Sequence, residues 1–369
     1  MKKIGIITYH CVDNYGAVLQ AYSLQDTVKK ISNLDVDIVD YRPIEITKNY
    51  SFSIIPKNKS VIKLISNLLS YPFKKQKNAK FKSFLSNHIK LSDNYYEGIW
   101  EEYDVLIAGS DQVWNPGITR LAPYYLNLPK SLAKKVSYAA SIGKDNLNES
   151  ELSYLSTAIS LVDNVSVREE SAVPIVAKAL PNKSVTQVLD PVFLKPAEQW
   201  LEILPKTKRF SNYILIYIME YNEELFKLAK KLSKQENKKI IIVSPNANIK
   251  TVLKSLKLPG KVLYTQGPIE FLDLIVNADY ICTNSFHGTA FSIIFEKKFI
   301  TVAHGSRNTR LESILDNLGI LSQQLDSKAC NAALEKDVAT LFQYDNAMVV
   351  RKLDDLKERS LKFLVEAVK

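Results

Sequence analysis

The sequence predicts an α/β fold with two Rossmann-like domains whose parallel sheets face each other across a cleft. Three observations lead to this fold class. Short apolar runs, typical of buried strands, alternate with amphipathic helical stretches along almost the whole chain. Six of these runs lie before residue 192 and five lie after it. Polar residues gather directly after the strand-like runs, and open α/β sheets bind their ligands at that edge.

In the first half of the chain, each expected strand is a short and mainly apolar run. The six runs are Lys3–Thr8, Val36–Tyr41, Asp104–Ala108, Lys135–Ala140, Asn164–Val167 and Val185–Leu189. A helix over Ala17–Lys30 follows the first run, because apolar residues recur there with helical spacing. Either Asp13 or Asn14 is expected to cap this helix, since a short polar side chain can accept a hydrogen bond from the first turn.

The second half repeats the alternation of strands and helices. Its expected strands and main helices are Tyr213–Ile218, Glu223–Lys234, Lys239–Val243, Lys261–Tyr264, Ile269–Asn277, Tyr280–Thr283 and Phe299–Ala303. We place the linker within residues 191–205, so that the first domain covers residues 1–192 and the second covers residues 193–345. A final helix over residues 346–369 is expected to pack back on the first domain.

A basic insertion is expected near residues 51–90. This stretch carries nine lysines and no Asp or Glu, and apolar residues recur between the lysines. The pattern predicts two amphipathic helices with a basic face, interrupted near Tyr71-Pro72 because proline disrupts a helix interior. Such a face suits an anionic membrane surface or an anionic substrate. An ordinary solvated helix, or a lid over the cleft, would carry the same pattern.

Composition and length exclude several classes of protein. The chain has 369 residues, of which 46% are hydrophobic and 24% are charged, as expected for a soluble globular protein. The longest apolar runs are strand-sized, so no membrane-spanning helix is expected. The first residues lack a small-residue cleavage site, which predicts a cytoplasmic location. The basic insertion adds peripheral contact with the inner membrane face as an option.

Cysteine and histidine usage argues against disulfides and against a metal site. The three cysteines, Cys11, Cys282 and Cys330, form no closely spaced pair, and the four histidines do not cluster with carboxylates. No recognised nucleic-acid-binding motif accompanies the net charge of +10, so no nucleic-acid partner is expected. The phosphate-binding GxxxxGK[ST], dinucleotide-binding GxGxxG and hydrolase GxSxG motifs are absent.

The most informative loop is Thr283–Thr289, which runs from a strand-like segment into a helix. It places His287 at the N-terminus of that helix, where backbone N–H groups and the helix dipole favour anions. A titratable imidazole beside an anion could transfer a proton to or from a phosphate-bearing substrate. The alternative is a histidine that only caps the helix.

Similar polar loops follow the other expected strands. They contain Arg, His, Asp and amide side chains, which together favour a polar, anion-binding site in the cleft. These loops are His10–Gly16, Gly109–Pro116, Ser141–Lys144, Arg168–Ser171, Ser244–Asn246 and His304–Arg307.

Several motifs, in a consistent order over residues 1–305, resemble those of the polysaccharide pyruvyl transferase family. The motifs are Asn14-Tyr15-Gly16, Leu19–Tyr22, Gly109–Asn115, Tyr138–Gly143, Ser166–Ser171, Leu189–Pro191 and Thr283–Gly288. The resemblance implies a two-domain fold of the GT-B glycosyltransferase kind and a role in bacterial surface polysaccharide biosynthesis. It also implies transfer of a pyruvyl group from phosphoenolpyruvate to two hydroxyls of a sugar, with formation of a cyclic ketal and release of phosphate. Phosphoenolpyruvate would be a co-substrate, and no cofactor is implied.

The resemblance also suggests roles for individual residues. The catalytic candidates are His287 and Asp111. Donor-binding candidates are Arg168, Ser285, Asn284, Gly288, Arg307 and Lys144. Acceptor-binding candidates are Asn14, Tyr15, Asn115 and Trp114. Two roles are open to His287, which could deliver a proton to the methylene carbon of the donor or bind its phosphate as imidazolium.

One position departs from the family pattern. Better-known members carry an arginine two positions before the histidine, where this chain has Ser285. The missing anion contact would come from elsewhere, and Arg307 and Lys144 are candidates, while Arg310 could add charge or pair with Glu312. The departure leaves two alternative functions open. The protein could be a GT-B glycosyltransferase with a nucleotide-sugar donor, or a non-catalytic glycan-binding protein with a decayed site. The expected acceptor is a glycan or a lipid-linked oligosaccharide.

Overall fold

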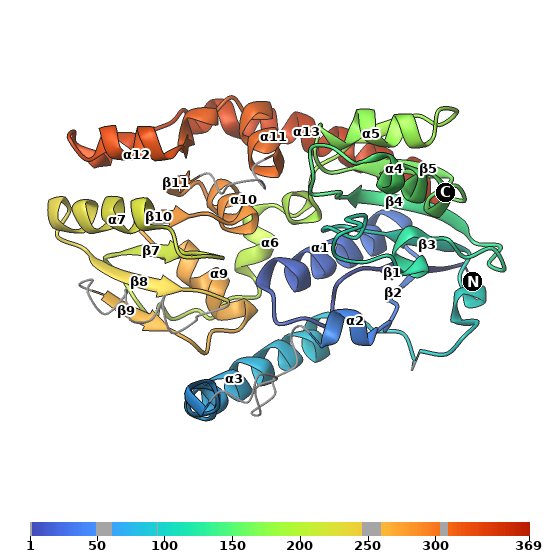
Figure 1. Cartoon of the computed structure of the whole chain (residues 1–369), viewed down its shortest axis with the longest axis horizontal. Coiled ribbons are helices and arrows are strands. Elements are labelled where there is room, and N and C mark those ends of the chain that lie inside the picture. Colours follow the sequence, from blue (N-terminus) through green and yellow to red (C-terminus); the bar gives the residue numbers. More distant parts are fainter. Residues whose placement is uncertain (1, 49–60, 94, 246–259, 303–308) are drawn as a thin grey trace.

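Two six-stranded parallel sheets form the framework of the molecule (Figure 1). The computed structural model describes residues 2–48, 61–93, 95–245, 260–302 and 309–369, and of residues 61–66 it describes only the backbone. Helices cover the faces of both sheets, and the two sheets lie side by side along the long axis of the molecule. The predicted fold class, two α/β domains with parallel sheets, is therefore confirmed.

The first sheet has the strand order β2-β1-β3-β4-β5-β6. Its strands are β1 (Lys3–Ile7), β2 (Asp35–Ile38), β3 (Val105–Ala108), β4 (Lys134–Ala140), β5 (Asn164–Val167) and β6 (Val185–Gln187). The helices around it are α1 (Tyr15–Ser32), α2 (Ile44–Thr47), α3 (Val61–His88), η1 (Ile99–Glu102), η2 (Ala122–Tyr125), α4 (Glu149–Ala158) and α5 (Ala172–Ala179). All six predicted strands are present. The first five are mainly buried, as expected for a parallel sheet covered on both faces, whereas β6 at the edge of the sheet is only partly buried.

The second sheet has the order β12-β11-β10-β7-β8-β9. Its strands are β7 (Tyr213–Tyr217), β8 (Lys239–Val243), β9 (Gly260–Leu263), β10 (Tyr280–Thr283), β11 (Lys298–Val302) and β12 (Gln324–Leu325). The helices around it are α7 (Glu223–Gln235), α9 (Pro268–Val276), α10 (Phe286–Ile294), α11 (Thr309–Asn317), η4 (Leu321–Gln323), α12 (Ser327–Ala333) and η5 (Val338–Phe342). The sequence predicted five strands here and missed β12, since two residues show no periodicity.

Between the sheets the chain passes through η3 (Pro191–Leu194) and α6 (Ala197–Leu201). The last helix, α13 (Asn346–Val368), contacts α1 and β4 of the first domain. The hydroxyl of Ser360 in α13 accepts a hydrogen bond of 2.9 Å from the backbone N–H of Leu189, beside η3. The end of the chain therefore packs against the point where the two domains are joined.

One prediction about the basic insertion is wrong. The sequence predicted two helices interrupted near Tyr71-Pro72, but α3 is one helix that contains Pro72. Proline removes only one backbone hydrogen bond from the helix. The residues after it are held in place, because Phe81 and Phe84 are buried in the core between the domains. Packing of this second half therefore outweighs the local cost of the proline. Residues 51–60 of the predicted insertion lie outside the described residues.

In each sheet there is one point at which the chain order of neighbouring strands reverses. In the first sheet the chain order reverses between β1 and β3, and in the second sheet it reverses between β7 and β10. Loops that leave the carboxyl ends of such neighbouring strands move apart and open a crevice. Each domain therefore offers one crevice, and the loops after these four strands supply most of the site described below.

An aromatic cluster joins the two domains beside these crevices. Tyr15, at the start of α1, stacks on Phe271 of α9 with the ring centroids 4.5 Å apart, and it also contacts Tyr217 of β7. Its hydroxyl donates a hydrogen bond of 3.0 Å to the carbonyl of Gln266. Residues of both sheets belong to one continuous apolar core. The cluster therefore fixes the start of α1 against the second domain.

A buried lysine adds a polar contact between the domains. The ammonium group of Lys77 in α3 donates to the carbonyl of Asp13, at 3.3 Å, and to the carbonyl of Pro245 in the second domain, at 3.0 Å. It also lies over the rings of Tyr15 and Phe81. Burial lowers the pKa of Lys77 to about 8, even though Asp13 favours the charged form. The ammonium group of Lys77 therefore lies at the domain boundary with little hydration, which makes its charged form less stable than in water.

The lowered pKa of Lys77 makes a testable prediction for stability. An unfolded lysine keeps its proton up to about pH 10.4, so between about pH 8 and that value the unfolded chain binds more protons and stability rises with pH. We expect the unfolding free energy of the wild type, relative to Lys77→Met, to rise by roughly 2 kcal/mol between about pH 7 and pH 10. Urea unfolding of both proteins across this range measures it. A difference that stays constant with pH would contradict the assignment.

Candidate functional site

A cavity of about 250 Å³ lies between the two domains, at the facing crevices. Its polar lining residues come from the loops after β1, β3, β7 and β10 and from the start of α11. The lining consists of Tyr9, Val12, Asn14, Ala17, Ile46, Asp111, Gln112, Ile118, Met219, Glu220, Asn284, Ser285, Phe286, His287, Arg310 and Leu311. Both domains therefore contribute, and the cavity exists only in their present arrangement.

The N-termini of three helices meet at this cavity. Asn14 is the N-cap of α1, and its side-chain oxygen accepts from the N–H of Ala17 at 3.4 Å. Ser285 caps α10 and accepts from the N–H of Gly288 at 3.4 Å. Arg310 lies in the first turn of α11. Helix N-termini carry partial positive charge and free N–H groups, so the cavity wall favours an anion.

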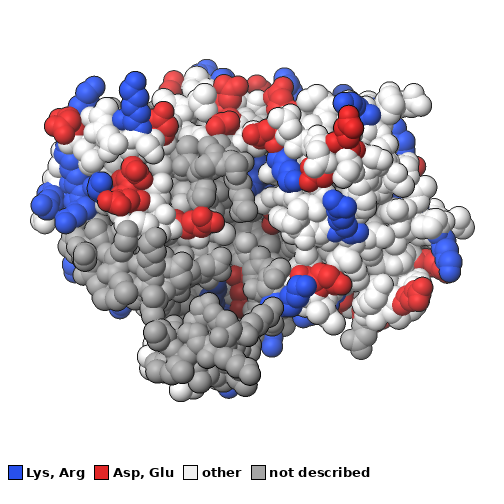
Figure 2. All heavy atoms as spheres, in the orientation of Figure 1, with Lys and Arg blue, Asp and Glu red and all other residues white. Residues whose placement is uncertain are grey.

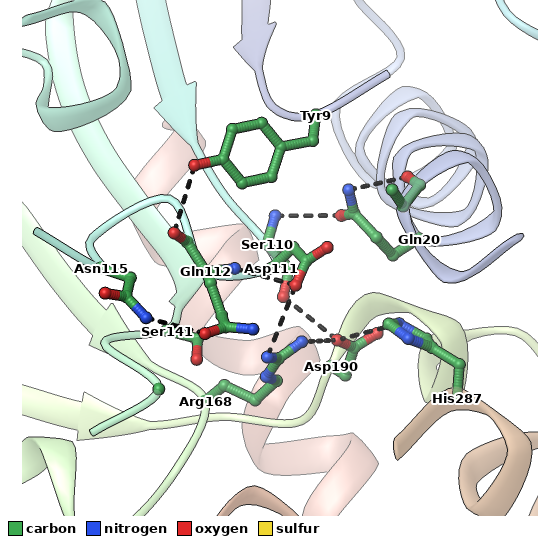
Figure 3. Close-up of polar contacts among 12 residues, drawn as sticks. Tyr9, Gln20, Ser110, Asp111, Gln112, Asn115, Ser141, Arg168, Asp190 and His287 are labelled. Atoms are coloured by element: carbon green, nitrogen blue, oxygen red, sulfur yellow. Dashed lines mark hydrogen bonds and ion pairs between the residues drawn. The ribbon is translucent and has the colours of Figure 1, made fainter. Parts of the chain in front are cut away.

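His287 lies in the first turn of α10 and reaches across to the first domain (Figure 3). A Cβ atom added to Gly16 of α1 would lie 2.0 Å from its Nδ1 atom, so the imidazole packs where a side chain at position 16 would be. The side chain is buried, and its Nε2 atom is 3.8 Å from a carboxylate oxygen of Asp190. Among the described residues, Nε2 has no hydrogen-bond partner. Nε2 is itself shielded from solvent, so the imidazole is packed between Gly16 and Asp190.

A buried ion pair lies behind His287 (Figure 3). Arg168, which follows β5, donates from Nη1 to Oδ2 of Asp190 at 2.7 Å. Its Nη2 atom is 3.8 Å from Oδ1 of Asp111, and its guanidinium lies over the ring of Phe286 at 4.6 Å. The hydroxyl of Ser110 also donates to Asp190, at 3.2 Å. The pair thus connects the loops after β3, β5 and β6 with the start of α10.

The loop that carries Asp111 is held by several hydrogen bonds. Oε1 of Gln20, in α1, accepts from the N–H of Ser110 at 3.0 Å, and the preceding peptide bond, Gly109–Ser110, is cis. Asp111 itself has a left-handed backbone with φ 69°. Its Oδ1 atom accepts from the N–H of Gln112 at 2.9 Å. These contacts direct the Asp111 carboxylate toward the cavity and toward Arg168.

The charges around the cavity shift the pKa values of its titratable groups. Burial lowers the pKa of His287, and Arg168 and Arg310 lower it further, so that these effects outweigh Asp190 and Asp111. Burial raises the pKa of Asp111, but the charges of Arg168, His287 and Arg310 outweigh burial and hold that pKa below its ordinary value. At neutral pH the site therefore holds a neutral imidazole beside an ionised carboxylate.

The structure places the predicted site residues in three groups. Those that line the cavity are Asn14, Asp111, Asn284, Ser285 and His287. Those that lie outside its lining are Tyr15, Trp114, Asn115, Lys144, Arg168 and Gly288. Arg307 lies outside the described residues.

The residues outside the lining have other contacts. Tyr15 belongs to the aromatic cluster between the domains, and Trp114 is completely buried. The amide of Asn115 donates to Oε1 of Gln112 at 2.8 Å, and Lys144 pairs with Glu151 at 2.5 Å. In this structure, therefore, these four side chains contact neighbouring residues of the protein.

The two remaining residues shape the site from behind. Arg168 contacts Asp111 and Phe286, both of which line the cavity. At Gly288 the backbone of α10 lies close to β10 and β7. A Cβ atom added there would lie 2.4 Å from the hydroxyl of Thr283 and 2.7 Å from the ring of Tyr217. Glycine is therefore needed for α10 to begin this close to the sheet.

Sequence analysis missed several residues of the site. Asp190 and Gly16 were noticed only as parts of motifs, although both contact the group around His287. Glu220 follows β7 and lines the cavity, and the side chain of Asn284 accepts from the N–H of Met219 and donates to the carbonyl of Glu220, both at 2.9 Å. A polar residue directly after the expected strand at Tyr213–Ile218 was the available signal for Glu220.

Two general properties of the described part of the chain bear on the site. It contains no group of three His, Cys, Asp or Glu side chains arranged to hold a metal ion. No described helix has the length and the hydrophobicity that crossing a membrane requires.

Comparison with known proteins gives a family and a fold. A model of the family described as polysaccharide pyruvyl transferase matches residues 14–306. No curated protein matches the chain. Among solved structures, UDP-N-acetylglucosamine 2-epimerase from Rickettsia bellii is 14% identical with a TM-score of 0.52, and the match covers 99% of this chain and 96% of the epimerase.

Two further structures support the same fold. UDP-GlcNAc 2-epimerase from Neisseria meningitidis, solved with UDP-GlcNAc, is 12% identical to this chain with a TM-score of 0.52. The match covers 98% of this chain and 100% of the epimerase. Arabidopsis thaliana UGT89C1 is 10% identical with a TM-score of 0.51, covering 99% and 98% of the two chains. At these identities the likeness shows the fold alone, which is the GT-B arrangement of two facing Rossmann-like domains, as predicted.

The contact between Gly16 and His287 makes a prediction that a double-mutant cycle can test. In Gly16→Ala the new methyl group overlaps the imidazole, so we expect His287 to be displaced and stability to fall by about 1–3 kcal/mol. In a His287→Ala background the clash is gone, and Gly16→Ala should be neutral or stabilising, because alanine favours a helix. Urea unfolding of the four proteins measures the coupling. Equal effects of Gly16→Ala in both backgrounds would contradict the contact.

Proposed function

This chain belongs to the polysaccharide pyruvyl transferase family, and from that premise we propose that it transfers a pyruvyl group from phosphoenolpyruvate to two hydroxyls of a glycan sugar. The product would be a cyclic ketal, and phosphate would be released. One observation carries the proposal: anion-favouring groups of the second domain share a single cavity with a carboxylate and amides of the first domain.

The donor would bind at the second-domain wall. Phosphoenolpyruvate carries a phosphate and a carboxylate, and both need N–H donors or positive charge. The first turns of α10 and α11 supply backbone N–H groups there, and Arg310 supplies a guanidinium. Arg168 would support this site from behind, since its charge already stabilises Asp190 and Asp111. Its role in the proposal is therefore to position and to balance charge.

The acceptor would bind at the first-domain wall. Asn14, Asp111 and Gln112 offer oxygen and amide groups that can bind sugar hydroxyls. Ile46 and Ile118 line the same cavity and can pack against the C–H face of a sugar ring. The acceptor would be a glycan, free or lipid-linked, and the reaction would take place in the cytoplasm.

The reaction needs one proton to be added and two to be removed. A proton adds to the methylene carbon of the donor, which leaves an oxocarbenium-like centre at the neighbouring carbon. One sugar hydroxyl attacks this centre and loses its proton to a base. The bond to the phosphate oxygen then breaks, the phosphate leaves with the electron pair, and the second hydroxyl attacks. Of the two hydroxyl protons, one replaces the proton given to carbon and the other leaves with phosphate.

We assign these proton transfers to His287 and Asp111. His287 is neutral at neutral pH, but an anionic donor beside it would raise its pKa and favour uptake of a proton. Imidazolium could then protonate the methylene carbon, or it could hold the phosphate. The ionised carboxylate of Asp111 could anchor a hydroxyl and take its proton as the hydroxyl attacks.

A cavity of about 250 Å³ has room for a small donor such as phosphoenolpyruvate. A nucleotide-sugar donor is the alternative that the following experiment distinguishes.

Thermal unfolding with phosphoenolpyruvate, phosphate and a panel of nucleotide sugars tests the proposal. A ligand that binds only the folded protein, at about 100 times its Kd, adds roughly 2.7 kcal/mol. We expect phosphoenolpyruvate to raise the melting temperature, and phosphate release with a suitable glycan to fall about 10²-fold or more in His287→Ala. Stabilisation only by a nucleotide sugar would overturn the proposal. Stabilisation by glycans alone, without phosphate release, would indicate a binding protein.

Arg310 provides a second test, because it is positioned to replace the arginine that the family pattern has at position 285. We expect Arg310→Ala to weaken binding of phosphoenolpyruvate by roughly 10-fold or more, the range for a charged hydrogen bond. Adding Ser285→Arg to that variant should restore part of the affinity, since it returns a guanidinium to the same wall. Isothermal titration of the three proteins measures this. Lys144→Ala is the matched control and should leave the affinity unchanged, because Lys144 pairs with Glu151 outside the cavity.

A further inference from the structure

The exposed residues of α3 gather before Lys77. Every residue from Tyr71 to Gln76 is exposed, and so are Leu68 and Leu69, whereas Ser70 is half-buried. The second half of α3 packs on the protein and buries Lys77, Phe81 and Phe84. Residues 68–76 therefore form the part of the described helix that presents most of its side chains to solvent.

This exposed part of α3 is rich in large apolar side chains. The exposed fractions are 59% for Leu68, 69% for Leu69, 39% for Tyr71 and 49% for Phe73. Phe73 still contacts Tyr264 of the second domain, with ring centroids 6.0 Å apart. Single exposed apolar residues are common on protein surfaces, but four within six residues form a patch that indicates an interaction surface.

The charged side chains of α3 itself are basic. α3 contains six lysines and no Asp or Glu. Lys74, Lys75 and Lys82 are exposed, while Lys77 and Lys80 bind groups between the domains. On the face of the molecule drawn in Figure 2, by contrast, basic and acidic side chains are interspersed. Leucine and aromatic side chains beside lysines, without acids, are the composition of helices that lie in the interface of an anionic membrane.

We propose that the first half of α3, from Leu68 to Lys75, docks on an anionic lipid surface. The apolar side chains enter the boundary between headgroups and acyl chains, and the lysines bind lipid phosphates. Aromatic side chains such as Tyr71 and Phe73 prefer this depth of a bilayer. A second copy of the chain fits less well, because two such helices would bring their lysines together.

The docking surface is connected to the cavity through the second half of α3. Lys77 binds the carbonyl of Asp13, and the amide of Asn78 donates to the carboxylate of Asp13 at 3.0 Å. Asp13 adjoins Asn14, which lines the cavity. A helix held on a membrane would therefore keep the cavity close to that surface. In terms of the proposed function, this suits an acceptor that is carried on a lipid.

Co-sedimentation of the full-length protein with vesicles tests the docking surface. We expect binding to vesicles that contain phosphatidylglycerol and much weaker binding to pure phosphatidylcholine, with the difference reduced by salt. The double variant Leu68→Ser/Leu69→Ser should lower the partition coefficient at least tenfold. Lys74→Gln/Lys75→Gln should lower it roughly fivefold for each lysine, which is the effect of about 1 kcal/mol.

Matched controls separate docking from general loss of apolar or positive surface. Leu132→Ser removes a leucine that is 99% exposed but lies outside α3, and Lys178→Gln removes an exposed lysine of α5. Both controls should bind vesicles like the wild type, and circular dichroism checks that all variants are folded. Equal binding to both kinds of vesicle, or equal losses in the controls, would overturn the proposal. Self-association that depends on Leu68 and Leu69, without vesicle binding, would also overturn it.

The vesicle experiment does not depend on the identity of the donor. Failure of phosphoenolpyruvate to bind would remove the proposed reaction and leave the docking surface intact. Loss of vesicle binding with normal phosphate release would remove the docking surface and leave the proposed reaction intact.

Discussion

The carboxylate of Asp190 is the group on which the arrangement of the site depends. It is completely shielded from solvent and accepts hydrogen bonds from Arg168, Ser110 and the backbone N–H of Val192. A buried carboxylate without partners would be very costly, so the carboxylate and the Arg168 guanidinium require each other. Asp190 is also the N-cap of η3, where the chain leaves the first domain. One residue therefore orders the charges behind the cavity and the start of the linker between the domains.

The groups in front of this ion pair come from opposite domains. Asp111 belongs to the first domain and His287 to the second, and the imidazole occupies the space that Gly16 leaves open in α1. Tyr15 and Lys77 hold the domains together directly beside that contact. Burial, together with charges from both domains, sets the pKa of each catalytic candidate. Any change in domain closure would therefore change both the geometry and the protonation of the site.

Five of the predicted site residues follow apolar runs and line the cavity: Asn14, Asp111, Asn284, Ser285 and His287. Membership of a motif alone did not predict a position in the lining. Trp114 and Tyr15 lie in the same motifs, but their large rings fill the core. Whether a residue of a motif faces a ligand or supports the loop depends on the direction of its side chain, which a motif does not specify. The fold class was predictable because the alternation of strands and helices is local.

The sequence by itself determined the two parallel sheets, the order of the loops at their carboxyl ends and the family resemblance, because apolar periodicity and short motifs are properties of neighbouring residues. Only the tertiary structure decided which loops meet. It placed Arg168 behind the cavity and Arg310 in its wall, and it paired Lys144 with Glu151. It also showed α3 continuing through Pro72, because the packing of Phe81 and Phe84, nine and twelve residues later, outweighs the local cost of the proline. Contacts between residues that are distant in sequence carry this information, and a single sequence does not encode them in any local pattern.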